Sequence, residues 1–187
     1  MIIGLTGSLG AGKGVILEYL QSQGFNHLST SNEVRDEARR RNIDLTRTNL
    51  QNLGNKLREK EGDSVLAKRL IAQMNSPGNY IVDGLRNPAE VIEMKNLKDF
   101  ILIAVDAPSP LRFTRLMSRN RESDPKTWEE FLRIDLRDKG EGEQKSGQQS
   151  AACMELADFN IYNDGDIGSV HEEIKSIIHA VRELKKE

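Results

Sequence analysis

Cysteine is almost absent from this chain, and Cys153 is the single thiol among 187 residues. One thiol forms no disulfide framework and no metal site built from several cysteines. The three histidines, His27, His171 and His179, are too scattered to supply metal ligands instead. These absences exclude a disulfide-stabilised domain and a structural zinc site. They fit a reducing compartment, so we expect a cytoplasmic protein.

Long hydrophobic runs and an excess of charge of one sign are also absent. No apolar run approaches the length of a membrane span, and the opening segment MIIGLTG has no basic, apolar leader. Lysine and arginine number 27 against 29 aspartate and glutamate, a formal net charge of -2. This balance argues against a general binder of nucleic acid or of membrane surfaces, so we expect small-molecule partners and a monomer or homodimer.

Short apolar runs alternate with longer stretches of helical periodicity. The runs, taken as strands, cover residues 2–6, 25–29, 79–84, 100–108 and 158–164. Helices are expected over 13–22, 46–60, 63–75 and 167–185, with further starts at Asn87, Ser109 and Asp124, each followed by proline. Apolar strands alternating with helices predict an α/β fold of three layers, α/β/α, around a parallel five-stranded sheet.

A glycine-rich stretch follows the first expected strand and opens the first expected helix. In the pattern Gly7-x-x-Gly10-x-Gly12-Lys13, backbone N–H groups surround a phosphate and the lysine contacts the outer phosphates. A glycine-rich turn with a surface lysine is the simpler alternative, but strand, spacing, lysine and helix all agree with a phosphate-binding loop (P-loop). The predicted nucleotide-binding residues are Gly7, Ser8, Leu9, Gly10, Ala11, Gly12, Lys13, Gly14 and Val15.

The loop lacks the hydroxyl residue that usually follows its lysine and reaches magnesium, because Gly14 and Val15 stand there. The segment GAGKG resembles the loop of adenylate kinases and related nucleoside monophosphate kinases, where glycine often follows the lysine. The resemblance implies ATP as donor, with Mg²⁺ held largely through water and the nucleotide phosphates. Val15 departs from the usual threonine of that family, which implies that one contact to a donor phosphate is lost.

The segment LSTSNEVR, residues 28–35, resembles the STGD-x-x-R motif that opens the acceptor-binding region of these kinases. The resemblance implies that Arg35 binds the acceptor phosphate and that Thr30 lies beside the acceptor base. Ser31-Asn32 departs from the Gly-Asp of the motif. Taken singly, Arg35 could also be a solvated helix residue beside the basic run 39–41.

The segment VDGLRNPAE, residues 82–90, resembles the family's DGFPRT-x-x-Q motif with one residue missing. It implies that Asp83 lies near magnesium, through water, and that Arg86 is a second arginine on the acceptor phosphate. Gly84 belongs to the same acceptor-binding segment, and Glu90 falls near the residue that contacts the base. Asp83 could also simply end a strand, and Glu90 could belong to a capping box that begins at Asn87.

The segment RLMSRNRESDP, residues 115–125, resembles the entry into the lid of these kinases. It implies that Arg115 stacks on the donor base and that Arg119 reaches donor phosphates. Arg121 and Arg133 resemble the lid arginines that close over the transferred group, and Arg137 follows one turn later. Clustered cations of this kind stabilise the negative charge that spreads over a phosphoryl group in the transition state of its transfer. An ordinary solvated basic face would explain the same residues.

The segment NIYNDGDI, residues 160–167, resembles the loop that lies along the donor base, which implies donor contacts from the backbone of Asn163, Asp164 and Gly165. A simple strand-to-helix turn is an equal alternative. The start GLTG and the stretch ADFNIYND are also similar to dephospho-CoA kinases. Those enzymes normally carry D-A-D after the second strand, where this chain has STSNEVR, so the acceptor segment favours a nucleotide.

Together these motifs predict a single P-loop kinase domain over residues 1–187. Its core would be 1–29, 78–117 and 151–187, its helical acceptor-binding region 30–77, and its short lid 118–150. Because 31–48, 118–126 and 138–150 contain few apolar residues, we expect mobile flaps or exposed connections there. The expected reaction is ATP-dependent phosphoryl transfer to a nucleoside monophosphate. Phosphorylation of a hydroxyl, as in dephospho-CoA kinase, and a nucleotide-binding sensor with little turnover remain the alternatives.

Overall fold

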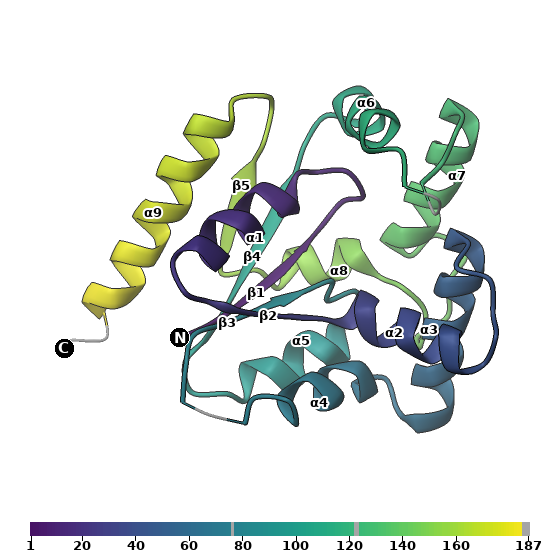
Figure 1. Cartoon of the computed structure of the whole chain (residues 1–187), viewed down its shortest axis with the longest axis horizontal. Coiled ribbons are helices and arrows are strands. Elements are labelled where there is room, and N and C mark those ends of the chain that lie inside the picture. Colours follow the sequence, from purple (N-terminus) through teal and green to yellow (C-terminus); the bar gives the residue numbers. More distant parts are fainter. Residues whose placement is uncertain (76, 122–123, 185–187) are drawn as a thin grey trace.

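The structure, a computed structural model of the chain, describes residues 1–75, 77–121 and 124–184. Residues 122–123 of the expected lid and the last residue of the expected helix 167–185 lie outside these ranges. The described strands form one parallel sheet in the order β2-β3-β1-β4-β5 (Figure 1). They are β1 (Ile2–Gly7), β2 (Asn26–Ser29), β3 (Tyr80–Asp83), β4 (Phe100–Asp106) and β5 (Phe159–Tyr162).

Helices connect and cover these strands. In chain order they are α1 (Lys13–Ser22), α2 (Thr30–Arg40), α3 (Arg47–Glu61), α4 (Val65–Ile71), α5 (Pro88–Lys95), α6 (Ser109–Arg119), α7 (Trp128–Lys139), α8 (Ser150–Glu155) and α9 (Ile167–Leu184). None of them, within the described ranges, is long and apolar enough to cross a membrane.

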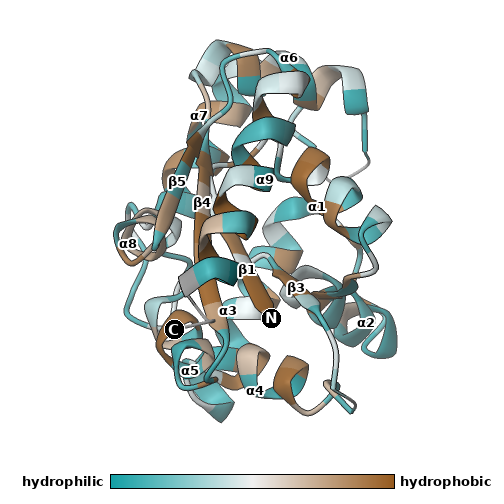
Figure 2. Ribbon diagram, turned by 90° about the vertical axis from the view of Figure 1, so that its left-hand side faces the viewer, coloured by the Kyte–Doolittle hydropathy of each residue, from teal (hydrophilic) through white to brown (hydrophobic). Residues whose placement is uncertain are grey.

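The sheet is buried on both faces, as the apolar runs predict. Ile3 and Leu5 of β1 have no exposed surface, and residues 102–105 of β4 are all buried. Helices α1 and α9 cover one face through Ile16 and Ile174, among others. Helices α4, α5 and α8 cover the other, and Figure 2 shows the hydrophobic strands between helices with hydrophilic outer sides. The predicted three-layer α/β/α fold with a parallel five-stranded sheet is confirmed.

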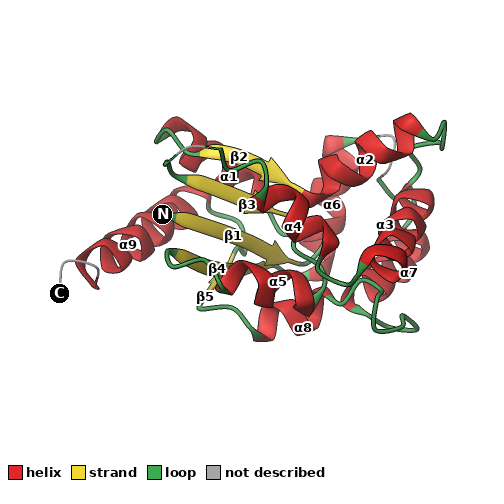
Figure 3. Ribbon diagram, turned by 90° about the horizontal axis from the view of Figure 1, so that it is seen from below, coloured by secondary structure: helices red, strands yellow, loops and turns green. Residues whose placement is uncertain are grey.

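The carboxyl ends of the strands point toward the end of the molecule where α2, α3, α6 and α7 gather (Figure 3). Helices α2 and α3 pack around Val34, Leu50 and Leu53. On the other side, α6 and α7 pack with Leu9 of the glycine loop through Leu116 and Phe131. Ligands of open parallel sheets bind at this end, so these two helical pairs frame the candidate site.

Helix α5 begins as its sequence predicts. The Asn87 side chain accepts a hydrogen bond from the backbone N–H of Ala89 at 3.0 Å, and a capping box with Glu90 is complete. The expected helix start at Asp124 is wrong, because α7 begins at Trp128 with Thr127 as its N-cap. Asp124 instead accepts hydrogen bonds from the side chain of Arg119, the last residue of α6.

Two of the three stretches expected as flaps or exposed connections are also different in the structure. Residues 30–40 form α2, although few of them are apolar. The segment 138–150 is held against the core: Asn87 Nδ2 donates to the carbonyls of Lys145 at 2.8 Å and Gly147 at 3.0 Å. The backbone N–H of Gln149 donates to the carbonyl of Arg86 at 2.6 Å. Charged and polar residues therefore build packed structure at this end of the sheet.

Candidate active site

Two adjoining pockets lie at the carboxyl end of the sheet. The large pocket encloses about 580 Å³ and is lined by the glycine loop, Asp83 and three arginines of the segment 115–121. The small pocket, of about 30 Å³, lies between α2 and α3. Four residues line both pockets and therefore mark their junction: Ser31, Arg35, Arg47 and Arg86.

The glycine loop takes the conformation that its sequence predicts. Gly10 and Gly12 have φ angles of 79° and 96°, which side chains rarely adopt. A Cβ on Gly10 would also lie 2.6 Å from the carbonyl oxygen of Arg112. Residues 9–15 all line the large pocket, whereas Ser8 is buried behind the loop and Gly7 ends β1. The N-terminus of α1 thus opens onto the pocket, which suits an anion.

Lys13 lies in this loop with its ammonium group folded back onto it. Its Nζ donates hydrogen bonds to the carbonyls of Gly7 at 2.7 Å and Ser8 at 2.9 Å. Burial lowers the pKa of Lys13 to about 8, although the carboxylate of Asp83 acts in the opposite direction. A partly desolvated cation at a helix N-terminus is a strong attractor for phosphate oxygens.

Asp83 ends β3 and faces the large pocket. Its Oδ1 is buried and accepts no hydrogen bond from the part of the chain that the structure describes. The described residues also hold no group of three or more histidine, cysteine or acidic side chains that could bind a metal. A single unpaired carboxylate fits Mg²⁺, which keeps most of its waters and needs only one or two protein oxygens beside phosphates.

Arg115 and Asn163 together brace the glycine loop. Arg115 Nη2 donates to Asn163 Oδ1 at 2.8 Å, and Asn163 Nδ2 donates to the carbonyl of Ala11 at 3.0 Å. Burial lowers the pKa of Arg115, which lines the large pocket. Asn163 therefore contacts the loop through its side chain rather than through backbone alone. Asp164 and Gly165 are exposed and are not part of the described lining of either pocket.

The lid arginines separate into two groups. Arg119 and Arg121 line the large pocket, and Arg119 pairs with Asp124 at 2.5 Å. Arg133 is exposed and belongs to the described lining of neither pocket. Arg137 donates to Glu143 at 2.5 Å and to Asn52 at 2.8 Å, so it joins α7 to α3. In this arrangement Arg133 and Arg137 do not meet the site, contrary to expectation.

The two expected acceptor arginines line the same two pockets. Arg35 and Arg86 both line the junction of the pockets. Burial lowers the pKa of Arg35, and the positive charge of Arg86 contributes to the same shift, which reflects their proximity. Thr30 lines the small pocket, and its hydroxyl donates to the carbonyl of Gly84 at 2.6 Å. Gly84 has a φ of 85°, and a Cβ there would lie 2.8 Å from Thr30 Oγ1.

Glu90 lies elsewhere than expected. It is fully buried, and its Oε1 accepts a hydrogen bond from Arg58 Nε at 2.8 Å. Its Oε2 accepts from the backbone N–H groups of Arg86 at 2.9 Å and Asn87 at 3.2 Å. Both oxygens are thus used within the fold, and the expected contact with an acceptor base is not supported.

The sequence did not indicate four polar residues near the junction. Arg47, Gln51 and Gln148 line the small pocket, and Asp138 of α7 lies beside them. Arg47 and Asp138 fall in stretches that their composition assigns to exposed segments. The one signal in the sequence was Arg47 itself: a cation in the first turn of a helix is unfavourable beside the positive end of the helix dipole, which indicates a tertiary reason for its place.

Comparisons with known proteins agree with this fold. A family model described as an AAA domain matches residues 3–144. A UPF0200 protein of Hyperthermus butylicus is 34% identical over 180 residues, covering 95% of this chain and 93% of that protein. Shikimate kinase from Acinetobacter baumannii in complex with shikimate aligns over 96% of this chain and 93% of its own, with a TM-score of 0.58 and 19% identity. A gluconokinase from Sinorhizobium meliloti 1021 aligns over 98% and 94%, with a TM-score of 0.57 and 11% identity.

The fold and the glycine loop therefore define a P-loop protein of the AAA-domain class whose architecture is that of small P-loop kinases. Within that class, the chain belongs to the UPF0200 family.

Proposed function

We propose that this chain is an ATP-dependent kinase that transfers the γ-phosphoryl group of ATP to the phosphate of a nucleoside monophosphate. The observation that carries this proposal is the junction of the two pockets. Arg35 and Arg86 lie there, between the P-loop of the large pocket and the small pocket between α2 and α3. Two arginines at that place would hold an acceptor phosphate against the end of a donor triphosphate.

The large pocket is the donor side of this proposal. Residues 9–15 would surround the ATP phosphates, with Lys13 on the outer ones and Arg119 and Arg121 over the transferred group. Arg115, braced by Asn163, would lie toward the base. Mg²⁺, held by Asp83 through water and by the nucleotide phosphates, would neutralise charge on the β- and γ-phosphates.

The proposed reaction needs no nucleophile from the protein. An oxygen of the acceptor phosphate forms the new bond to the γ-phosphorus, and the bond from that phosphorus to the β–γ bridging oxygen breaks, which releases ADP. Arg35 and Arg86 would fix the position of the attacking phosphate, and Lys13 would stabilise the charge of the moving group. The acceptor would also help to exclude water from the junction, because water competes for the phosphoryl group.

A hydroxyl acceptor is the second candidate, and Asp83 is the observation that favours it. Its unpaired Oδ1 at the pocket could accept a proton from an attacking hydroxyl. The structural neighbours named shikimate kinase and gluconokinase are named for acceptors of that kind. A nucleotide-binding sensor with little turnover is the third, since Val15 and Ser31-Asn32 depart from the kinase motifs.

One assay separates these candidates. ADP release from Mg·ATP is measured with AMP, GMP, CMP, UMP and their deoxy forms, and in parallel with dephospho-CoA, shikimate and gluconate. The proposal predicts that at least one monophosphate raises the rate far above the rate with ATP alone. Stimulation only by a hydroxyl compound would replace it with the second candidate. If the chain binds ATP but no compound stimulates ADP release, the third candidate, a nucleotide-binding sensor, is the one supported.

Gly54 shapes the small pocket, although it lies in the middle of α3. A Cβ there would meet Arg58 Nη1 and Val34 Cγ2 at 3.6 Å, which is ordinary contact. Packing therefore tolerates alanine, and glycine inside a helix is unfavourable by roughly 1 kcal/mol relative to alanine. In a pocket of about 30 Å³ the missing methyl group is space for the acceptor.

Replacing Gly54 by alanine should accordingly stabilise the fold and weaken acceptor binding. We expect the melting temperature to rise by about 2–4 °C and KM for the monophosphate to rise on the order of tenfold, since one methylene in a pocket has such effects. Gly168→Ala in α9, outside both pockets, is the matched control and should leave KM unchanged. An unchanged KM in Gly54→Ala would argue that the acceptor does not enter the small pocket.

A further inference from the structure

Arg47 lies at the junction of the two pockets, together with the two arginines that the kinase motifs indicate. It is the first residue of α3 and lines both pockets, as Arg35 and Arg86 do. Its side chain is 12% exposed, and its Nε is buried with no hydrogen-bond acceptor among the described residues. An unpaired buried guanidinium donor is unfavourable unless a ligand satisfies it.

The position of Arg47 in its helix strengthens this point. The first turn of α3 contains no acidic residue, so the cation adds to the positive end of the helix dipole instead of opposing it. Burial lowers the pKa of Arg47 to about 10, and the charge of Arg86 acts in the same direction. Three positive features thus converge on one small volume: the helix terminus, Arg47 and Arg86.

Asp138 partly compensates this charge. Its Oδ1 accepts hydrogen bonds from Arg47 Nη2 at 2.8 Å and from Arg86 Nη1 at 3.0 Å. Burial alone would raise the pKa of Asp138, but the charges of Arg86 and Arg47 hold it below its usual value, so it is a carboxylate. One carboxylate against the guanidinium groups of Arg35, Arg47 and Arg86 leaves two positive charges uncompensated. A phosphate monoester carries about -1.5 to -2 at neutral pH, which matches that excess.

We propose that Arg47 is a third arginine of the acceptor-phosphate site and that Asp138 is the counter-charge that holds Arg47 and Arg86 together when no anion is bound. The inference rests on the proposed function for the identity of the anion, a phosphate monoester. The presence of an anion site at the junction can be tested without any turnover. The alternative is that Arg47 and Asp138 only tie α3 to α7 as a structural pair.

The test uses inorganic phosphate as the probe and the melting temperature as the readout. The full chain is saturated with Mg²⁺ and a non-hydrolysable ATP analogue, so that the P-loop is filled. Phosphate is then titrated at constant ionic strength against potassium chloride. A ligand that binds the folded state raises the melting temperature according to its concentration and its Kd. We expect a saturable rise for the wild type.

Two variants are expected to change this rise in opposite directions. Arg47→Gln should raise the Kd for phosphate by about tenfold or more, because a charge-assisted contact is lost. Asp138→Asn should melt lower than the wild type without phosphate and should gain more from phosphate than the wild type does, since the added anion replaces the missing carboxylate. A purely structural pair would lower the melting temperature in both variants and leave the phosphate response unchanged.

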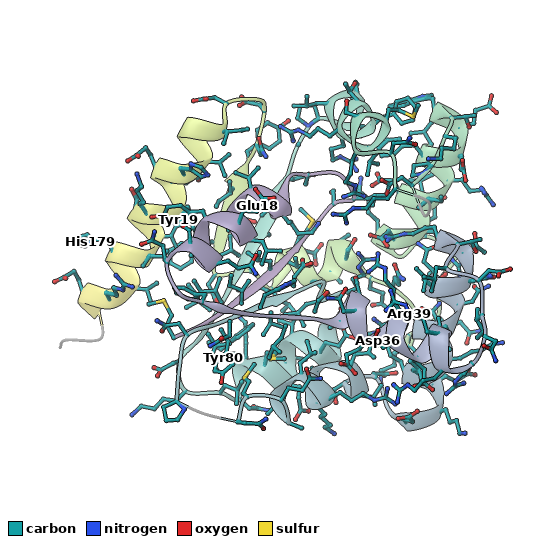
Figure 4. The ribbon with its side chains drawn as sticks, viewed as in Figure 1. Glu18, Tyr19, Asp36, Arg39, Tyr80 and His179 are labelled. Atoms are coloured by element: carbon teal, nitrogen blue, oxygen red, sulfur yellow. The ribbon has the colours of Figure 1, made fainter. Side chains whose placement is uncertain are left out.

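Arg39→Gln is the matched control. Arg39 lies on the exposed side of α2, where it pairs with Asp36 at 2.5 Å (Figure 4), and its loss removes the same charge away from the pockets. Its phosphate response should equal that of the wild type. A wild type without a saturable response, or a response of Arg47→Gln equal to that of Arg39→Gln, would overturn the inference. The proposed function fails separately, if no monophosphate stimulates ADP release in the acceptor panel.

Discussion

Replacing Lys13 by methionine is expected to lower kcat for phosphoryl transfer by roughly a hundredfold to a thousandfold, the usual loss when one preorganised group at a developing charge is removed. Lys13 Nζ lies within 2.9 Å of two carbonyls of the P-loop, in reach of the phosphates that the loop would hold. The acceptor-dependent rate of ADP release measures the effect. A variant that keeps more than about a tenth of the wild-type rate would contradict the role of the loop, because that loss is under about 1.4 kcal/mol.

The same substitution should leave the fold intact. Lys13 is a partly buried residue rather than an exposed one, but its burial disfavours the charged form, as its lowered pKa records. Methionine carries no such charge and can occupy the same space. We therefore expect a melting temperature equal to or above that of the wild type. Lys175→Met on α9, where Lys175 pairs with Glu172, is the control and should keep full activity.

The pKa of Lys13 also predicts how nucleotide affinity depends on pH. With a pKa of about 8 in the free protein, Lys13 loses its proton above that pH, whereas bound phosphates favour the charged lysine. Binding therefore takes up a proton, and the Kd for ATP should rise above pH 8 by up to about tenfold per pH unit. Lys13→Met should show no such rise between pH 8 and 9. A titration of ATP affinity against pH checks both.

The sheet could be predicted from the sequence because its signal is local and uniform. Parallel strands covered on both faces are short apolar runs, and each of the runs that contain Ile3, Val82 and Ile103 became a buried strand. The P-loop could be predicted for the same reason, since its strand, glycines, lysine and helix follow one another within a few residues. The capping box at Asn87 could also be predicted, because each of its partners is within three positions.

Only part of the helical end of the molecule could be predicted: α3 and the start of α6 were expected, but several of the residues buried there are charged. Arg112 and Asp135 are both buried and form a bidentate pair, at 2.5 and 2.9 Å, between α6 and α7. From the sequence alone, charged residues of this kind are predicted to be exposed to solvent, because only the fold brings the two partners of the ion pair together. For the same reason the segment after Asp138 was expected as a flap. Helix α2 was missed because it buries only Thr30, Val34 and Ala38 in an otherwise charged stretch.

In the candidate site, too, some residues could be predicted from the sequence and others could not. Asp83 ends β3 and Arg86 follows three residues later, and both line the large pocket. Arg133 was assigned by its resemblance to a lid arginine, and Arg137 because it follows one turn later. In the structure Arg133 is exposed and Arg137 pairs with α3, and neither lines a described pocket. Arg47 and Asp138 were missed, because no short motif marks two residues that meet across 91 positions of the chain.

The central claim is that Arg35 and Arg86 hold the acceptor phosphate in front of the donor. Lysine keeps the charge but lacks the planar fork that holds two phosphate oxygens, so Arg35→Lys tests the geometry rather than the charge. The acceptor phosphate is itself the nucleophile, and misplacement by about an ångström can slow a reaction on the order of a hundredfold. Arg86→Lys should behave in the same way, and Arg39→Lys on the exposed side of α2 is the control.

The most direct measurement is therefore the steady-state kinetics of Arg35→Lys with the monophosphate and with ATP varied in turn. The account predicts a higher KM for the monophosphate, a kcat lower by about a hundredfold, and a KM for ATP that hardly changes, because the donor phosphates are held by the loop around Lys13. Monophosphate kinetics equal to those of Arg39→Lys and the wild type would contradict the acceptor site and, with it, the proposed kinase activity.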